Sequence, residues 1–262
     1  MASNTKIQPL LGSTEVNQLA FVVNDIEKAS ADFSKLLGIP NPGWFLTGDE
    51  EVSKVIYKGK STASQSKLAF LNTPTVQFEL IEPNMEPGTM REFLNETGEG
   101  IHHIAVDVDK IQNHLPNLEK NGYPLLQSGE FTSSDGRYIY VDTTNETKTL
   151  IELLESAEPR DTTYKAGEEK PLLGTNVVEQ LAIVVKDLDR AADKFCQLLG
   201  VKKPAVIQSG HSDITKVVYN GEATDADSRY MFIRTPLLEI ELIEPGKAPS
   251  TWKTHLESYG EG

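Results

Sequence analysis

Apolar residues follow two different periods along the first hundred positions, and the switch between them marks the elements. Residues 16–23 form a continuous apolar run, typical of a strand buried on both faces. Apolar residues at helical spacing follow, with Asp25 as the predicted N-cap and Gly38 as the predicted end of a helix. Three further strands are predicted at 52–57, 67–71 and 75–81, and a short helix at 85–96. The order is therefore strand, helix and three strands, or βαβββ.

The same order returns twice along the chain. A looser copy predicts a strand, a helix and three strands at 101–108, 109–120, 123–127, 137–142 and 149–154. After a polar segment, the pattern of 9–100 recurs from residue 171, with every matched residue 162 positions later. We therefore predict a complete domain over 1–156, built from units 9–100 and 101–156. A linker over 157–170 and a third unit over 171–262 follow it.

The third unit lacks a predicted partner, because the sequence stops at Gly262, where a second copy of 101–156 would begin. Two interpretations stay open. The sequence is a truncated form of a longer protein, or the third unit is completed by another chain in a homodimer.

The composition of the chain excludes several classes of binding partner. The formal charge of −14 and the pI of about 4.8 argue against nucleic acid or an anionic membrane, since both are bound through basic surfaces. The sequence has neither an apolar signal core near its start nor a run of about 20 apolar residues, so we expect a cytoplasmic protein with a small-molecule substrate. Cys196 is the single cysteine, which excludes an intramolecular disulfide and a thiolate-rich metal site.

Four polar residues interrupt the predicted buried strands at matched places. Gln18 and His103 lie in the first strands of the two units, and Glu79 and Glu152 lie in the last strands. Because two homologous units would pack around a pseudo-twofold axis, we expect these four side chains to meet. One imidazole nitrogen and three oxygens suit a six-coordinate divalent metal such as Co, Ni, Zn, Mn or Mg.

The third unit repeats half of this ligand set. Gln180 and Glu241 occupy the places of Gln18 and Glu79, and they predict an incomplete second site. His102 alternates to the face opposite His103 and is predicted either to be structural or to support the ligands from behind.

These residues give the chain a resemblance to the vicinal oxygen chelate superfamily, which includes glyoxalases, bleomycin resistance proteins and dioxygenases. Gly98–Ala105 and Leu150–Leu153 are similar to methylmalonyl-CoA epimerases, and the ligand order Gln, Glu, His, Glu resembles glyoxalase I. The resemblance implies an α+β fold in which paired βαβββ units form half-barrel sheets around a metal. Ser61–Gln65 holds no carboxylate where those epimerases carry a further glutamate base, and Glu50 and Glu51, at a different spacing, are the candidates to replace it.

The function implied is a metal-dependent isomerase, epimerase or lyase acting on a small oxygen-chelating substrate through a metal-stabilised enolate or enediolate. Glu152 is the first candidate for the base that removes the substrate's α-proton, and Glu79 is the second. A ring-cleaving dioxygenase is less favoured, because Gln18 stands where its metal triad would need a histidine. The alternative is a non-catalytic drug- or metabolite-binding protein of the same fold.

Overall fold

The predicted α+β fold is confirmed by a computed structural model that describes residues 8–133 and 135–262. Residues 1–7 of the predicted first domain lie outside that range. The first unit contains β1 (Gln18–Val22), α1 (Ile26–Leu37), β2 (Phe45–Leu46), α2 (Glu50–Ser53), β3 (Ile56–Tyr57), β4 (Lys60–Ser61), β5 (Ser66–Asn72), β6 (Gln77–Pro83) and α3 (Thr89–Glu96). The second contains β7 (Gly100–Asp107), α4 (Ile111–Lys120), β8 (Leu125–Glu130), β9 (Gly136–Val141), α5 (Thr144–Thr147) and β10 (Leu150–Ser156).

Helix α1 begins and ends where its sequence predicts. The Asp25 side chain accepts a hydrogen bond from the Lys28 amide, and Gly38 ends the helix in the left-handed conformation at φ 62°. The prediction of a strand from residue 52 is wrong at its start. Residues 50–53 form the one-turn helix α2, because the Asp49 carboxylate accepts the amides of Glu51 and Val52 and so begins a helix.

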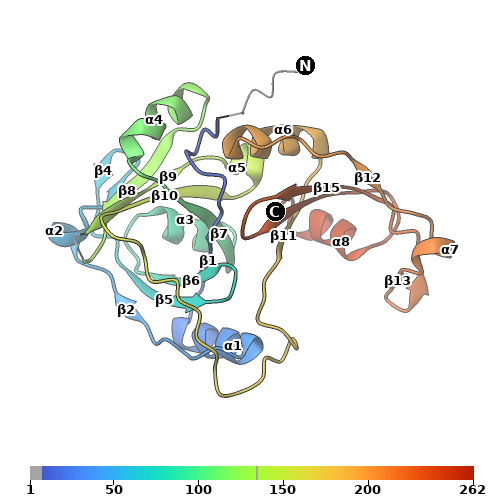
Figure 1. Ribbon diagram of the computed structural model, residues 1–262, viewed down its shortest axis with the longest axis horizontal. Coiled ribbons are helices and arrows are strands. Elements are labelled where there is room, and N and C mark those ends of the chain that lie inside the picture. The colour runs from blue at the N-terminus through green and yellow to red at the C-terminus, as the bar shows by residue number, and fades with distance from the viewer. Residues whose placement is uncertain (1–7, 134) are drawn as a thin grey trace.

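A ten-stranded sheet joins the two units in the order β2-β5-β6-β1-β7-β10-β9-β8-β3-β4. Antiparallel pairing of β1 with β7 forms the junction, and each of these strands has a parallel partner on its other side, β6 and β10. Strands β2 and β3 come from one short segment yet lie toward opposite ends of the sheet, and residues 47–55 join them. The sheet must therefore curl until its ends approach each other (Figure 1).

The two faces of the curled sheet differ in character. One face carries apolar side chains that pack beneath α1 and α4, among them Leu19, Leu80, Ile104 and Leu153. Strand alternation turns Gln18, Glu79, His103 and Glu152 to the other face, which lies inside the curl. The main core thus lies on the outside of the curled sheet, and the inside carries these polar groups together with a smaller apolar cluster.

The third unit reproduces the first element by element. It contains β11 (Gln180–Val184), α6 (Leu188–Leu199), β12 (Ile207–Gln208), α7 (Ser212–Thr215), β13 (Val218–Tyr219), β14 (Glu222–Ala223), β15 (Ser228–Arg234), β16 (Glu239–Pro245) and α8 (Thr251–Ser258). Each element begins and ends 162 positions after its counterpart. Helix α6 packs against both its own sheet and α5 of the second unit, so one apolar core continues from the first domain into the third unit.

The polar segment predicted as a linker has no helix or strand among its described residues, yet it is held against the first unit. The Gly167 amide donates to the Gly38 carbonyl at 2.9 Å, and Arg160 forms four side-chain hydrogen bonds. The predicted boundaries at 156 and 170 stay predictions. Among the helices that the structure describes, none combines the length and the apolar character needed to cross a membrane.

Candidate metal site and cleft

Two rows of paired residues across the central strands place the four predicted ligands on one face. In the first row, Ala20 of β1 lies between Glu79 of β6 and His103 of β7. In the second, Ala105 of β7 lies between Gln18 of β1 and Glu152 of β10. Directly paired residues share a face of a sheet, and the small alanine at the centre of each row leaves room between the polar side chains.

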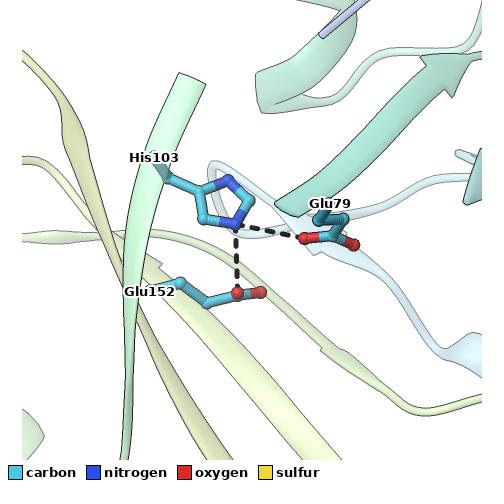
Figure 2. A group of neighbouring side chains, drawn as sticks. All are labelled: Glu79, His103 and Glu152. Carbon is cyan, nitrogen blue, oxygen red and sulfur yellow. Dashed lines mark ion pairs between the residues drawn. The ribbon is translucent and has the colours of Figure 1, made fainter. Parts of the chain in front are cut away.

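Three of these side chains converge on one point (Figure 2). His103 Nε2 lies 3.4 Å from Glu79 Oε2 and 3.1 Å from Glu152 Oε2, and all three residues are buried. Their ligand atoms lie within 4.8 Å of one another, so the group could hold a metal ion. The first-strand and last-strand positions singled out in the sequence are therefore brought together by the fold.

The chemistry of the donors fits a divalent cation. Gln18 Oε1 is buried and has no hydrogen-bond partner among the described residues, and the buried His103 Nε2 and the two carboxylates have only one another. A buried acceptor without a partner destabilises a fold unless something else satisfies it. A single cation would satisfy the imidazole nitrogen and the two carboxylates, and the Gln18 amide oxygen at the wall of the same cleft is a further donor of the kind that such a cation takes.

Burial and charge perturb the ionisation of the group. Burial raises the pKa of the Glu79 carboxyl, and the neighbouring charge of Glu152 acts in the same direction. Burial alone would lower the pKa of His103, but the carboxylates of Glu152 and Glu79 raise it to about 9. A proton on His103 is thus one way to balance the two carboxylates, and a divalent cation is another.

His102 lies beside the site, so the prediction that it turns to the face opposite His103 is wrong, because a register shift in the pairing of β1 with β7 interrupts the strand alternation there. His102 Nδ1 lies 2.8 Å from His103 Nδ1, and the His102 ring packs edge-on against Phe93 and Tyr140. Burial lowers the pKa of His102 well below the ordinary value, so its ring is neutral and can accept from His103 Nδ1–H. That hydrogen bond leaves the lone pair of His103 Nε2 directed at the carboxylates, as a metal ligand requires.

Two tyrosines complete the wall next to Glu152. Tyr140 of β9 is paired with Glu152 of β10, and its ring centroid lies 4.9 Å from that of His103. Burial raises the pKa of Tyr140 well above its usual range, with the charges of Glu152 and Glu79 adding to the effect. Tyr138 has a pKa raised mainly by burial as well. Both hydroxyls therefore stay protonated and can donate hydrogen bonds.

The site opens into a cleft of about 680 Å³ inside the curl. Gln18, Glu79 and Glu152 lie at its wall. Apolar and aromatic side chains make up much of the rest, namely Phe45, Val55, Leu68, Phe70, Met90, Phe131, Tyr138, Tyr140 and Leu154. The charged residues at the wall, besides the two glutamates of the site, are Glu130, Asp135, Glu158, Arg160 and Asp161. Arg160 is the one lysine, arginine or histidine among the described lining residues.

The third unit places its two candidate ligands differently. Gln180 is exposed, and its amide nitrogen donates to Glu239 at 3.0 Å. Glu241 is half-buried, and burial followed by the charge of Glu239 raises its pKa. Of the described residues, only Glu79, His103 and Glu152 form a group of three such side chains with ligand atoms this close. A second site at Gln180 and Glu241 stays a prediction.

Four residues that line the cleft, Tyr138, Tyr140, Gln77 and Arg160, were not found from the sequence. Tyr140 could have been found, because alternation in its strand puts Tyr138 and Tyr140 on one face beside the strand that carries Glu152. Gln77 and Arg160 carried no usable signal, since one stands at the start of a buried strand and the other lies in a polar segment without periodicity.

The family model of the glyoxalase/bleomycin resistance protein/dioxygenase superfamily matches residues 17–141 and 179–259, which include three of the four predicted ligands. The chain belongs to this superfamily. The resemblance inferred from the sequence is thereby confirmed, and the match covers both copies of the repeat.

Two curated relatives match part of this superfamily chain. An uncharacterised protein, YqjC, of Bacillus subtilis (strain 168) is 28% identical over 109 residues, covering 40% of this chain and 78% of the relative. The human mitochondrial methylmalonyl-CoA epimerase is 29% identical over 107 residues, covering 40% of this chain and 52% of the relative. This chain thus spans about half the length of the human relative.

A solved structure resembles nearly the whole chain. A mutant of 4-hydroxymandelate synthase from Streptomyces coelicolor matches 95% of this chain and 69% of its own, with a TM-score of 0.57 and 15% identity. At that identity the match shows the fold alone, and it agrees with the curled sheets of the superfamily.

Proposed function

We propose that the chain is a metal-dependent isomerase, epimerase or lyase that moves an α-proton of a small oxygen-chelating substrate. The observation that carries this proposal is the buried group of Glu79, His103 and Glu152, whose ligand atoms lie within 4.8 Å of one another, together with the unpartnered Gln18 Oε1 at the wall of the same cleft. Two neighbouring buried carboxylates and a buried acceptor without a partner are costly, and a bound cation would relieve both costs.

Gln18, Glu79, His103 and Glu152 would hold the metal. When bound, a divalent ion would polarise the substrate's oxygens and stabilise the negative charge that develops as the α-proton leaves. The two carboxylates would balance its charge, so the developing anion meets a site close to neutral.

Glu152 is the proposed base. Its Oε2 lies 3.1 Å from His103 Nε2, and the residue lines the cleft, where it can accept a proton and return it. The Tyr140 hydroxyl stays protonated beside it and would donate to an oxygen of the substrate. Glu50 and Glu51 do not line the cleft, and the Glu50 carboxylate accepts from Ser61 Oγ at 2.7 Å, so neither supplies a second base here.

The cleft favours a substrate with an apolar or uncharged body. The human relative is named for a coenzyme A ester, a ligand that carries several phosphate charges. Here the described wall offers the single cation Arg160 against several acids, and Arg160 is already hydrogen-bonded to Asp107. Anionic phosphates would be repelled by this wall, whereas a compact chelating substrate with an aromatic or aliphatic body would fit it.

The second candidate is a binding protein that sequesters a small apolar molecule in the same cleft. The aromatic wall favours it, and the buried group of Glu79, His103 and Glu152 disfavours it. The two candidates differ in whether the site needs a metal.

The test measures hydrogen exchange. Chelator-treated protein is reloaded with Co, Ni, Zn, Mn or Mg and incubated in deuterated water with a set of β-keto and α-hydroxycarbonyl acids. The proposal expects metal-dependent deuterium incorporation at an α-carbon by the wild type and none by Glu152→Gln, while Glu119→Gln, at an exposed position of α4, keeps it. Metal binding without exchange on any compound, together with tight binding of an apolar ligand, would favour the binding protein.

A further inference from the structure

Arg160 occupies an unusual place between the polar segment after β10 and the candidate metal site. Its guanidinium donates to Gln77 Oε1 at 3.0 Å, to Asn17 Oδ1 at 3.1 Å and to Asp107 at 3.0 Å and 3.3 Å. Only 16% of its side chain is exposed. An arginine held by this many acceptors is fixed in position.

The hydrogen bonds continue from Arg160 to a predicted metal ligand. Gln77 Oε1, which accepts from Arg160, also accepts from Gln18 Nε2 at 2.8 Å. Gln18 Oε1 is then the atom left buried and unpartnered. An arginine can only donate, so the Gln77 atom that it meets must be the oxygen, and the Gln18 atom that meets this oxygen must be the nitrogen.

The other end of the Gln77 amide is fixed in the same way. Its Nε2 donates to Asn72 Oδ1 at 2.7 Å, and Asn72 Nδ2 donates to the carbonyls of Asp161 and Thr163 at 3.3 Å and 3.2 Å. Both routes begin in the segment that contains Arg160. Without them, Gln77 and Gln18 could both turn over and present nitrogen in place of oxygen to the site, because the two ends of an amide are nearly the same in shape.

We propose that Arg160 is a positioning residue that, through Gln77, holds the Gln18 amide with its oxygen directed at the metal site. The inference rests on the proposed function, because it takes Gln18 as a ligand. It also gives the polar segment a role in the chemistry of the first domain.

The third unit supports this inference, because a different residue type orients the matched glutamine there. Glu239 occupies the place of Gln77, and its Oε1 accepts from Gln180 Nε2 at 3.0 Å. Its other oxygen accepts from Arg234 at 3.0 Å. A carboxylate presents an acceptor at both ends, so it orients the glutamine without needing to be oriented itself.

The test uses this difference. Binding of Co²⁺ to the full chain is measured by calorimetry and by the visible spectrum of the bound ion, for the wild type, Arg160→Ala, Gln77→Glu and the double variant. We expect Arg160→Ala to weaken binding about tenfold and to change the spectrum, as loss of a partner behind a ligand does. In the Gln77→Glu background, the same removal should change affinity less than about threefold, because the introduced carboxylate still orients Gln18. Arg137→Ala, which removes an arginine paired with Glu155, is the matched control.

The direction of the change in Co²⁺ affinity distinguishes a positioning role of Arg160 from an effect of its charge alone. Deleting a cation near a cation site should tighten binding if Arg160 acts only through its charge. Unchanged or tighter Co²⁺ binding by Arg160→Ala overturns the inference, and so does an equal loss in the wild-type and Gln77→Glu backgrounds. If the wild type itself binds no metal, the proposed function fails and the inference fails with it. Melting curves of all variants show whether any of them has lost the fold.

Discussion

The first and third units share every element boundary but differ in how deeply the same positions are buried. Gln18 and Glu79 are buried, whereas Gln180 is exposed and Glu241 is half-buried. The difference lies in the neighbours. Strand β1 lies between β6 and β7, whereas within the described residues β11 has β16 on one side and only Gly262 on the other. The first unit therefore contributes Gln18 and Glu79, and the neighbouring strand β7 buries them and contributes His103.

The helices show the opposite difference. Helix α6 buries seven residues, and its counterpart α1 buries four. Helix α6 packs against α5 as well as its own sheet, and the Leu11 amide donates to the Leu198 carbonyl. The two copies of the repeat thus bury different numbers of helix residues, because each copy packs against different neighbours.

The largest expected effect is a loss of unfolding free energy on truncating a phenylalanine, and it should differ between two matched positions. Phe195 of α6 is fully buried, and Phe195→Ala should cost about 3–5 kcal/mol of unfolding free energy by opening a cavity. Phe33 of α1 is half-buried, and Phe33→Ala should cost only about 2 kcal/mol. Urea unfolding followed by circular dichroism measures both. Equal losses of unfolding free energy in the two variants would show that the extra packing of α6 does not stabilise the protein.

The next effect concerns pH and the group formed by Glu79 of the first unit with His103 and Glu152 of the second. Because Glu152 and Glu79 raise the pKa of His103 to about 9, above its ordinary 6.5, the folded state holds this proton more tightly than the unfolded chain. The resulting stability is full below pH 6.5 and is lost as the pH rises through about 9. The loss should be on the order of 3 kcal/mol in chelator-treated protein.

Matched variants sharpen this pH prediction. Glu79→Gln removes one of the two carboxylates beside His103, so it should reduce the loss of stability between about pH 6.5 and about pH 9.5. Glu241→Gln should leave that loss unchanged, because no histidine is paired with Glu241 in the described residues. Urea unfolding at several pH values measures both variants. A wild-type stability that rises over this range would contradict the account.

The smallest expected effect exchanges one side chain between the copies. Ser34 of α1 and Cys196 of α6 are both buried at matched positions, and Ser34 Oγ has no hydrogen-bond partner among the described residues. Ser34→Cys should therefore stabilise the protein by about 1 kcal/mol, and Cys196→Ser should destabilise it by about as much. Differences in melting temperature measure both. Destabilisation by Ser34→Cys would show that the hydroxyl is satisfied.

The sequence predicted the parts of the fold that local patterns determine. Buried apolar runs located β1 and β7, and Asp25 and Gly38 marked the ends of α1. The likeness of the first two units identified matched polar residues in their first and last strands. That match was enough to predict that Glu79, His103 and Glu152 lie close together. These predictions succeeded because strand alternation and duplication both act through sequence order.

What the sequence missed depends on contacts between distant segments. Helix α2 was missed because a single Asp49 cap outweighed a strand-like run. Arg160 was missed because its importance comes only from Gln77 and Asp107, far away along the chain. No local period records such a contact, so polar segments that cross a site are the hardest part to predict.

The central claim is that the first unit with β7 and β10 forms a divalent metal site, and metal content tests it most directly. Elemental analysis of Co-loaded wild type, Glu79→Gln and Glu241→Gln compares the two copies in one experiment. The account predicts about one ion per chain for the wild type and Glu241→Gln, and under about 0.1 for Glu79→Gln after gel filtration. No bound ion in the wild type, or equal retention by Glu79→Gln and Glu241→Gln, would contradict it.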